Sequence, residues 1–280
     1  MLPFYSKIQP VMESVKIHKL AALISHNFRL AWAYKLNFVT RYLGMIISVL
    51  LFFFLDQLLQ RSGSGQVEGG TYFTFLIIGG AFSKFLELSS HAFSANLREE
   101  MLQGTIEPLL VTATPVTLAL LGPSSWMLLE GVLLVLLQLG VGTAVGADFS
   151  HANWGTAVLV LLVSLSSLIS YGIFSAAFVI VFKRGDPMNW FINSVAYVFS
   201  GVFFPVELLP GWLRIISYAL PFTYALRALR GALMRGETIA EVGGDLLVLG
   251  GFTAVLLPLS FFALRYAIRH LKQTGELAHY

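Results

Sequence analysis

Four ionisable side chains stand inside stretches that are otherwise apolar: Lys84, Glu87, His91 and Glu130. The first three follow at i, i+3 and i+7, so they share one stripe of a helix. Charged groups inside a membrane usually pair with one another or face a cavity. Lys84 and Glu87 are expected to neutralise each other, with a polar lining as the alternative. Counting about 1.5 Å per residue from the expected helix ends places Glu130 in the outer half of its span and Lys84 in the inner half, so the two are poor partners. We therefore expect Glu130 to face a path or a subunit interface.

The same residues allow an alternative chemistry. Glu87, His91 and Glu130 could serve as acid–base groups of an intramembrane enzyme acting on a lipid or glycolipid, provided that two of them meet. However, the sequence contains no HExxH or GxSxG motif, no cysteine, and no metal-ligand spacing among its histidines. It also lacks a GxxxxGK[ST] phosphate loop. If ATP is bound by such a loop, the loop must belong to another polypeptide. No catalytic, cofactor or metal site is therefore expected in this chain.

A charged segment, residues 96–114, separates two apolar runs. Its polar and flexible members are Arg98, Glu99, Glu100, Gly104, Thr105 and Glu107. Because charge is costly in hydrocarbon, the segment must lie in water or against another protein. We expect a short helix that breaks near Gly104 and ends at Pro108. An ordinary cytoplasmic hairpin is the alternative interpretation.

The composition places most of the chain in a membrane. Of the 280 residues, 56% are hydrophobic and 12% are charged, and the mean hydropathy is +0.76. Soluble domains carry about 25% charged residues. The excess apolar surface must face lipid, since one water-soluble core could not bury it. Small and hydroxyl residues, such as Ser164 and Ser167, are expected to serve helix packing.

Six stretches are long enough to cross about 30 Å of hydrocarbon as helices of roughly 20 residues. The predicted fold is therefore an all-α membrane protein in which residues 42–280 form a six-span domain. The expected spans are Tyr42–Leu59, Thr71–Phe93, Val116–Val145, Gly155–Phe182, Met188–Val206 and Asp245–Ala267. The Gly-Ser-Gly segment between the first two spans is expected to be a flexible loop.

Residues 1–41 are expected to form a cytoplasmic arm. Within Ile17–Asn37, basic residues such as Lys19 and Arg29 take one helical face, whereas Phe28 and Trp32 lie on another. This pattern is typical of an amphipathic helix that lies in the membrane interface and contacts lipid headgroups. A soluble arm that docks elsewhere on the same protein is the alternative.

The distribution of Lys and Arg predicts the orientation. Twelve of the 18 basic residues fall in the N-terminal arm, the second and fourth inter-span segments and the C-terminal tail. Five fall on the other side, namely Arg61, Arg214, Arg227, Arg230 and Arg235. Because cytoplasmic loops carry the excess of positive charge, both termini are expected to be cytoplasmic. Arg227, Arg230 and Arg235 fit this orientation least well.

The region 205–225 cannot form a full span. It combines Pro205, Pro210 and Pro221 with Trp212 and two charged residues. Two short helices that dip back into the outer leaflet fit this pattern, since irregular backbone at depth is tolerated only when it is buried in protein. A surface amphipathic loop with Trp212 in the aromatic belt is the alternative.

Two strings resemble those of ABC-2 type transporter permeases. Glu100-x-x-x-Gly104-Thr105-Ile106-Glu107-x-Leu109-Leu110, followed by Thr114-Pro115, is similar to the cytoplasmic segment after their second span. Leu209-Pro210, Pro221-Phe222-Thr223-Tyr224 and Arg230 match the spacing of the C-terminal signature, whose upstream half matches only in part around Phe199 and Ser200. The resemblance covers essentially the whole chain.

The resemblance implies the ABC-2 exporter fold, with an interfacial N-terminal helix, six spans and a re-entrant hairpin before the last span. It implies a permease subunit in the bacterial cytoplasmic membrane that pairs with a second permease, identical or related. Two ABC ATPase subunits would bind ATP and Mg beneath the pair. Nucleic acid is not an expected partner.

The resemblance also assigns roles to residues. The segment 96–114 and the turn that contains Lys183, Arg184 and Asp186 would couple the permease to the ATPase. Pro205, Pro210, Trp212, Pro221 and Arg230 would belong to the re-entrant region. A path rich in Phe, Leu, Val and Ser favours amphipathic, lipid-linked or drug-like cargo. An energy-independent carrier is a further alternative.

Overall fold

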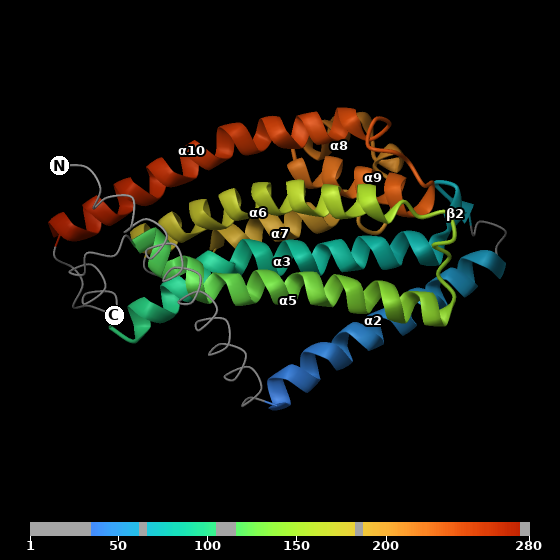
Figure 1. Ribbon diagram of the computed structural model, residues 1–280, viewed down its shortest axis with the longest axis horizontal. Helices are drawn as coiled ribbons and strands as arrows, with labels where there is room; N and C mark the ends of the chain where they lie inside the picture. The colour runs from blue at the N-terminus through green and yellow to red at the C-terminus, as the bar shows by residue number, and fades with distance from the viewer. Residues whose placement is uncertain (1–34, 62–65, 105–115, 183–186, 275–280) are drawn as a thin grey trace, which may run out of the picture.

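The computed structural model describes the whole chain except residues 1–34, 62–65, 105–115, 183–186 and 275–280, which Figure 1 draws in grey. The described residues are almost entirely helical, which confirms the all-α class. The helices are α2 (Lys35–Arg61), α3 (Tyr72–Leu102), α5 (Val116–Val145), α6 (Trp154–Phe182), α7 (Pro187–Phe199), the 3₁₀ helix η1 (Val206–Leu208), α8 (Gly211–Tyr218), α9 (Pro221–Met234) and α10 (Gly243–Thr274). Two short strands, β1 (Gln66–Val67) and β2 (Gly70–Thr71), precede α3.

The centre of the bundle is α3. It packs against α5 and α6, while α10 packs against α6 on the outside (Figure 1). The most apolar stretch of α3 is 83% buried, whereas that of α10 is 11% buried. Phe75, Phe82 and Phe85 of α3 are fully enclosed in the main core. The side chains of α10 that are exposed are mostly apolar, as expected for a helix surrounded by lipid.

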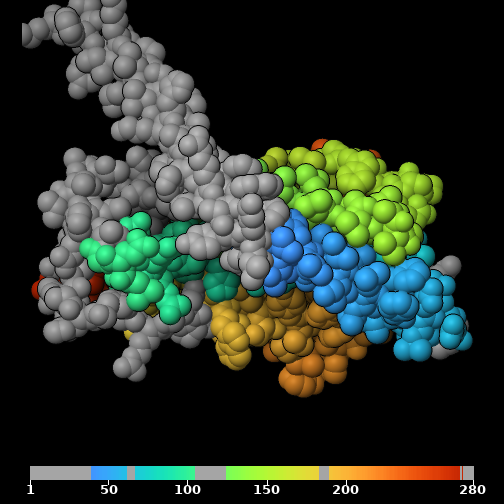
Figure 2. Space-filling view, turned by 90° about the horizontal axis from the view of Figure 1, so that it is seen from below, coloured from blue at the N-terminus to red at the C-terminus, as the bar shows by residue number. Residues whose placement is uncertain are grey.

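The helix α2 crosses the bundle obliquely and lies on its surface. Figure 2 shows α2 in blue, with α5 on one side and α7 and α8 on the other. Its inner side contributes Met45, Val49 and Phe52 to the buried residues. Its outer side carries exposed apolar residues, including Ile47 and Phe54. Both the covered side and the exposed side of α2 are therefore apolar, which suits a helix that is surrounded by lipid.

In the part of the chain that the structure describes, five helices are long and apolar enough to cross a membrane: α2, α3, α5, α6 and α10. They correspond to the expected first, second, third, fourth and sixth spans, and α5 has the expected bounds of Val116–Val145. However, α2 begins at Lys35, inside the expected arm, and α3 continues from Phe93 to Leu102. The first extension carries Arg41 and the second carries Arg98. Long basic side chains of this kind can reach the interface while the helix continues.

The expected fifth span, Met188–Val206, is shorter in the structure. It is represented by α7, which ends at Phe199 after 13 residues and is therefore about 20 Å long. The chain then leaves the helix at Gly201, whose φ is +80°. This left-handed conformation favours glycine and interrupts the helix. The boundary predicted at Val206 is therefore wrong.

The expected flexible loop before the second span is partly a hairpin. β1 and β2 pair in antiparallel fashion, with Gln66 opposite Thr71 and Val67 opposite Gly70. Glu68 and Gly69 form its two-residue turn with φ values of 52° and 85°, which is the geometry that hairpin turns require. An ion pair of 3.6 Å between Arg235 and Glu68 joins the hairpin to the end of α9.

Gly79 of α3 lies where the bundle is most closely packed around a glycine of this helix. A Cβ at this position would lie 2.3 Å from the Val202 carbonyl oxygen and 2.9 Å from the Arg230 guanidinium. We expect Gly79→Ala to lower the free energy of unfolding by roughly 1–3 kcal/mol, because the packed backbone must shift. Gly140→Ala on α5 is the matched control, since nothing lies within 4 Å of its Cβ position. Equal thermal unfolding of the two variants in detergent would contradict this packing.

Candidate functional site

A cavity of about 460 Å³ lies between the first half of α2, the middle of α3 and α5. Arg41, Lys84 and Glu87 line it together with Thr40, Ser48 and several apolar residues. Glu130 lies beside it and contacts Arg41. The structure therefore brings together at one cavity the three path candidates of the sequence, Lys84, Glu87 and Glu130.

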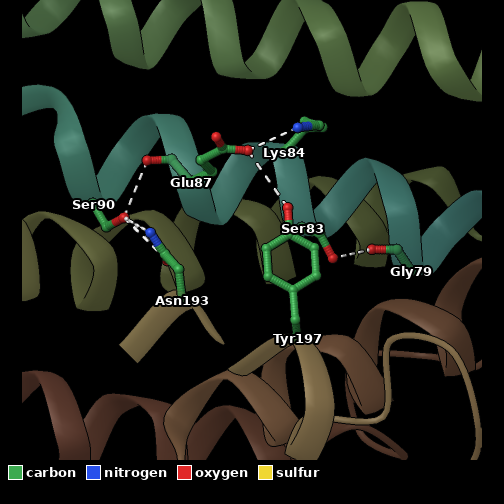
Figure 3. A network of polar contacts seen from close by, with 7 residues as sticks. All are labelled: Gly79, Ser83, Lys84, Glu87, Ser90, Asn193 and Tyr197. Atoms are coloured by element: carbon green, nitrogen blue, oxygen red, sulfur yellow. Dashed lines mark hydrogen bonds and ion pairs between the residues drawn. The ribbon is translucent and has the colours of Figure 1, made fainter. Parts of the chain in front are cut away.

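Two ion pairs neutralise the charges at this cavity. The Lys84 Nζ donates to Glu87 Oε2 at 2.8 Å, which confirms the pairing expected from their spacing. The Tyr197 hydroxyl of α7 approaches the same carboxylate oxygen at 3.5 Å, as Figure 3 shows. The Arg41 Nη1 donates to Glu130 Oε1 at 2.5 Å. Glu130 is only 8% exposed, so its charge depends on this partner.

The depth expected for Glu130 is wrong. A Cβ at the neighbouring Gly131 would lie 3.6 Å from Leu88 Cβ, so Glu130 is level with the part of α3 that carries Lys84. The cause is the extension of α3, against which the first described turns of α5 pack. There the Ser124 hydroxyl donates to a main-chain carbonyl of α3 at 2.9 Å. Counting residues from the expected membrane boundary missed this shift.

The pairing of both carboxylates bears on the chemistry of the cavity. Glu87 is engaged by Lys84 and Glu130 by Arg41. A general acid or base must instead exchange a proton with a group at hydrogen-bond distance. Within the described residues, no group of three His, Asp or Glu side chains could hold a metal ion. The paired charges suit the reception of a polar group better than acid–base catalysis.

A row of polar contacts between α3 and α7 was missed from the sequence. The Asn189 amide donates to the Ser94 hydroxyl at 2.8 Å and to the Ser90 carbonyl at 3.3 Å. Asn193 and the Ser90 hydroxyl lie 3.4 Å apart (Figure 3). The signal was available, because two asparagines four residues apart face two serines with the same spacing. Such contacts fix the register of helices in membranes.

The first part of the expected coupling segment is the end of α3. Arg98 and Glu99 are exposed, and the Gln103 amide donates to the Glu99 carboxylate at 3.1 Å. Gly104 has a φ of +69°, and its N–H donates to the Met101 carbonyl at 3.2 Å. This is the usual way in which a glycine ends a helix. The break at Gly104 is confirmed, but the charged residues before it continue α3 and form no separate helix.

The other coupling candidates lie outside the described residues. They are Thr105, Glu107, Lys183, Arg184 and Asp186. Glu100 belongs to the last turn of α3 and is partly exposed. The charged end of α3 is thus the described part of this proposed site.

Two short helices, α8 and α9, form in the expected re-entrant region. Pro205 and Pro210 directly precede η1 and α8, and Pro221 is the first residue of α9. These are positions where proline costs no helix hydrogen bond. Trp212 is 69% exposed on α8. The second helix extends to Met234, beyond the expected limit at residue 225.

Arg230 of α9 is buried, which the sequence did not reveal. Only 3% of the residue is exposed, and its guanidinium lies 3.3 Å from the centre of the Phe75 ring. It donates to the carbonyls of Gly201 at 2.7 Å, Val202 at 3.0 Å and Phe75 at 3.3 Å. The sequence counted it among the charges of the last outer segment, whereas the structure buries it in a helix, where it holds the break after α7 against α3.

The two neighbouring arginines are also compensated. Arg227 forms a bidentate ion pair with Asp245 at the start of α10. Arg235 binds Glu237 at 2.6 Å and the hairpin residue Glu68. These pairs neutralise basic residues of α9 and of its C-terminal end, a region that the charge distribution assigns to the less basic side.

Comparison with known protein families gives a match over most of the chain. The family model described as ABC-2 type transporter matches residues 18–234. The match includes the cavity, the charged end of α3, the short helices α8 and α9, and Arg230. No curated protein matches the chain.

The ion pair between Arg41 and Glu130 can be tested with a double-mutant cycle. We expect Arg41→Gln and Glu130→Gln to show a coupling of roughly 1–3 kcal/mol in thermal unfolding, since either change alone leaves one charge without its partner. The control pair is Glu130→Gln with Arg98→Gln, because Arg98 lies nearly four turns of α3 beyond Lys84. The effects of these two changes on thermal unfolding should be additive. Additive effects of Arg41→Gln and Glu130→Gln would exclude the ion pair.

The role of Arg230 can be tested against its neighbour on the same helix. Arg230→Gln should lower the free energy of unfolding by roughly 3 kcal/mol or more, because several buried carbonyls lose their donor. Arg227→Gln should cost less than about 1 kcal/mol, because its ion pair is partly exposed. Both values can be measured by thermal unfolding in detergent. A smaller effect at Arg230 than at Arg227 would refute the proposed role.

Proposed function

The chain belongs to the ABC-2 type transporter family, and we propose that it is the permease subunit of an ATP-driven exporter. The match over residues 18–234 confirms the resemblance of the two sequence strings. The chain is a multi-pass membrane protein with the role of a transport component, and the family's membrane components are not themselves catalytic. The proposal adds the direction of transport, the class of cargo and the identity of the partner subunits.

The observation that carries the proposal is the continuity of α3. This helix of 31 residues is about 46 Å long. It begins in the packed core beside Arg230 and ends with Arg98, Glu99 and Glu100, where Gly104 stops it. Because this charged end is rigidly joined to a buried span, a partner that binds it can transmit its own movement to the bundle. The partner proposed here is an ABC ATPase.

The proposed complex contains two permease subunits, identical or related, and two ATPase subunits that bind ATP and Mg. Both termini and the charged end of α3 would face the cytoplasm of a bacterial cell. Thr105 and Glu107, together with the turn at Lys183, Arg184 and Asp186, would complete the coupling surface. ATP-driven closure changes the permease only if these contacts differ between its two states.

The cargo is proposed to be amphipathic, lipid-linked or drug-like. The support is the cavity between α2, α3 and α5, where charged Arg41, Lys84 and Glu87 stand among apolar neighbours. Such a lining accommodates a polar group attached to an apolar body. The alternative of an intramembrane enzyme loses support, because Glu87 and Glu130 are each engaged by a cation.

Copurification from native membranes tests the proposal. An ABC ATPase should remain bound to the full chain in mild detergent, and the complex in proteoliposomes should hydrolyse ATP. We expect Glu99→Lys with Glu100→Lys to abolish the copurification, since the charge of the gripped end is reversed. Gly104→Pro should reduce ATP-driven transport strongly, because proline cannot adopt a φ of +69°.

The control variant is Arg61→Gln, the last residue of α2. Figure 1 shows the end of α2 and the end of α3 at opposite ends of the bundle. This variant should retain both ATPase binding and hydrolysis. Wild-type binding by the Glu99→Lys, Glu100→Lys variant would refute the role of this end of α3. Transport by the chain alone would favour the carrier instead.

A further inference from the structure

A groove between the second halves of α6 and α10 has a volume of about 310 Å³. Its walls are almost wholly apolar, and five of its eight lining residues are aromatic. Phe182, Phe262 and Tyr266 are each more than half exposed along it. Because α6 and α10 are membrane-spanning candidates, the groove opens toward the surrounding lipid. This site lies away from the cavity between α2, α3 and α5.

One wall of the groove is a row of phenylalanines on α6. Phe174, Phe178 and Phe182 follow at intervals of four residues, so they share one helix face. Their ring centres are 5.3 Å and 5.5 Å apart, and the second pair is stacked. The row forms a straight apolar wall, which suits a linear hydrocarbon chain better than a compact ligand.

The groove leads to a basic end of α10. Arg265 and Arg269 follow Phe262 at i+3 and i+7 on the same stripe of the helix. Both side chains are exposed, and within the described residues neither forms an ion pair. The two helices run side by side in the same direction, with the Ser167 and Thr253 hydroxyls 2.6 Å apart. Arg269 therefore lies near the level at which α6 ends.

We propose that this groove binds an anionic phospholipid, with one acyl chain along the phenylalanine row and the phosphate group against Arg265 and Arg269. Burial of each methylene against apolar walls is favourable. The two arginines supply the charge complement, since basic clusters at the ends of membrane helices attract anionic headgroups. A zwitterionic lipid gains the same apolar contact but little from the arginines. The inference requires only that the chain spans a membrane.

Native mass spectrometry of the full chain, delipidated in a neutral detergent, tests the proposal. Phosphatidylglycerol and phosphatidylcholine with identical acyl chains serve as the probes. The wild-type chain should bind phosphatidylglycerol at least tenfold more tightly than phosphatidylcholine. Arg265→Gln with Arg269→Gln should lower the affinity for phosphatidylglycerol about tenfold, because the positive charge opposite the phosphate group is removed. Arg61→Gln should change neither affinity.

A second pair of variants tests the position of the acyl chain. Val181→Trp places a large side chain in the groove at an exposed position, and it should weaken binding of both lipids. Val158→Trp is the matched control, since Val158 is an exposed residue of α6 outside the groove. Equal binding of the two lipids by the wild type would overturn the headgroup assignment. Unchanged binding by Val181→Trp would overturn the groove as the site.

Discussion

The fold depends on hydrogen bonds to main-chain groups where a helix stops inside an apolar bundle. Without water, an unpaired carbonyl in such a place costs several kcal/mol. The guanidinium of Arg230 donates to the carbonyls of Gly201 and Val202 after α7 and to that of Phe75 on α3. Gly79, which has no Cβ, leaves room for this approach. One buried cation thereby permits α7 to end early and the short helices α8 and α9 to follow.

The same helix that receives Arg230 carries the other polar features of the bundle. Along α3, Phe75 contacts Arg230, Glu87 pairs with Lys84 at the cavity, and Arg98 stands at the exposed end. Serines of α3 hold α7 through two asparagines. The buried sides of α3 therefore fix its position, and its charged end extends the same rigid helix out of the core.

Features set by neighbouring residues were predictable from the sequence. The bounds of α5 and the ion pair of Lys84 with Glu87 follow from hydropathy and helical spacing, which are local properties. The depth of Glu130 was not predictable, because it depends on where α5 packs along α3. Arg230 stood in a recognised string, but its partners are carbonyls, which no side-chain pattern reveals. The two-residue turn at Glu68 and Gly69 carried a local signal that was missed.

The two halves of α2 are attached to the bundle in different ways. Toward its end, Phe52 packs beside Gly80 and Gln138, and Asp56 accepts the Phe73 N–H at 3.0 Å. Toward its beginning, the cavity separates α2 from α3, and the Arg41–Glu130 ion pair spans the gap to α5. Among the described side chains of the first half, Met45 is the buried apolar one, whereas the second half contributes Val49 and Phe52 to the main core. Separating the second half would therefore expose core residues, and separating the first half would break the ion pair. A ligand group that competes for Arg41 or Glu130 would therefore favour opening at the cavity itself.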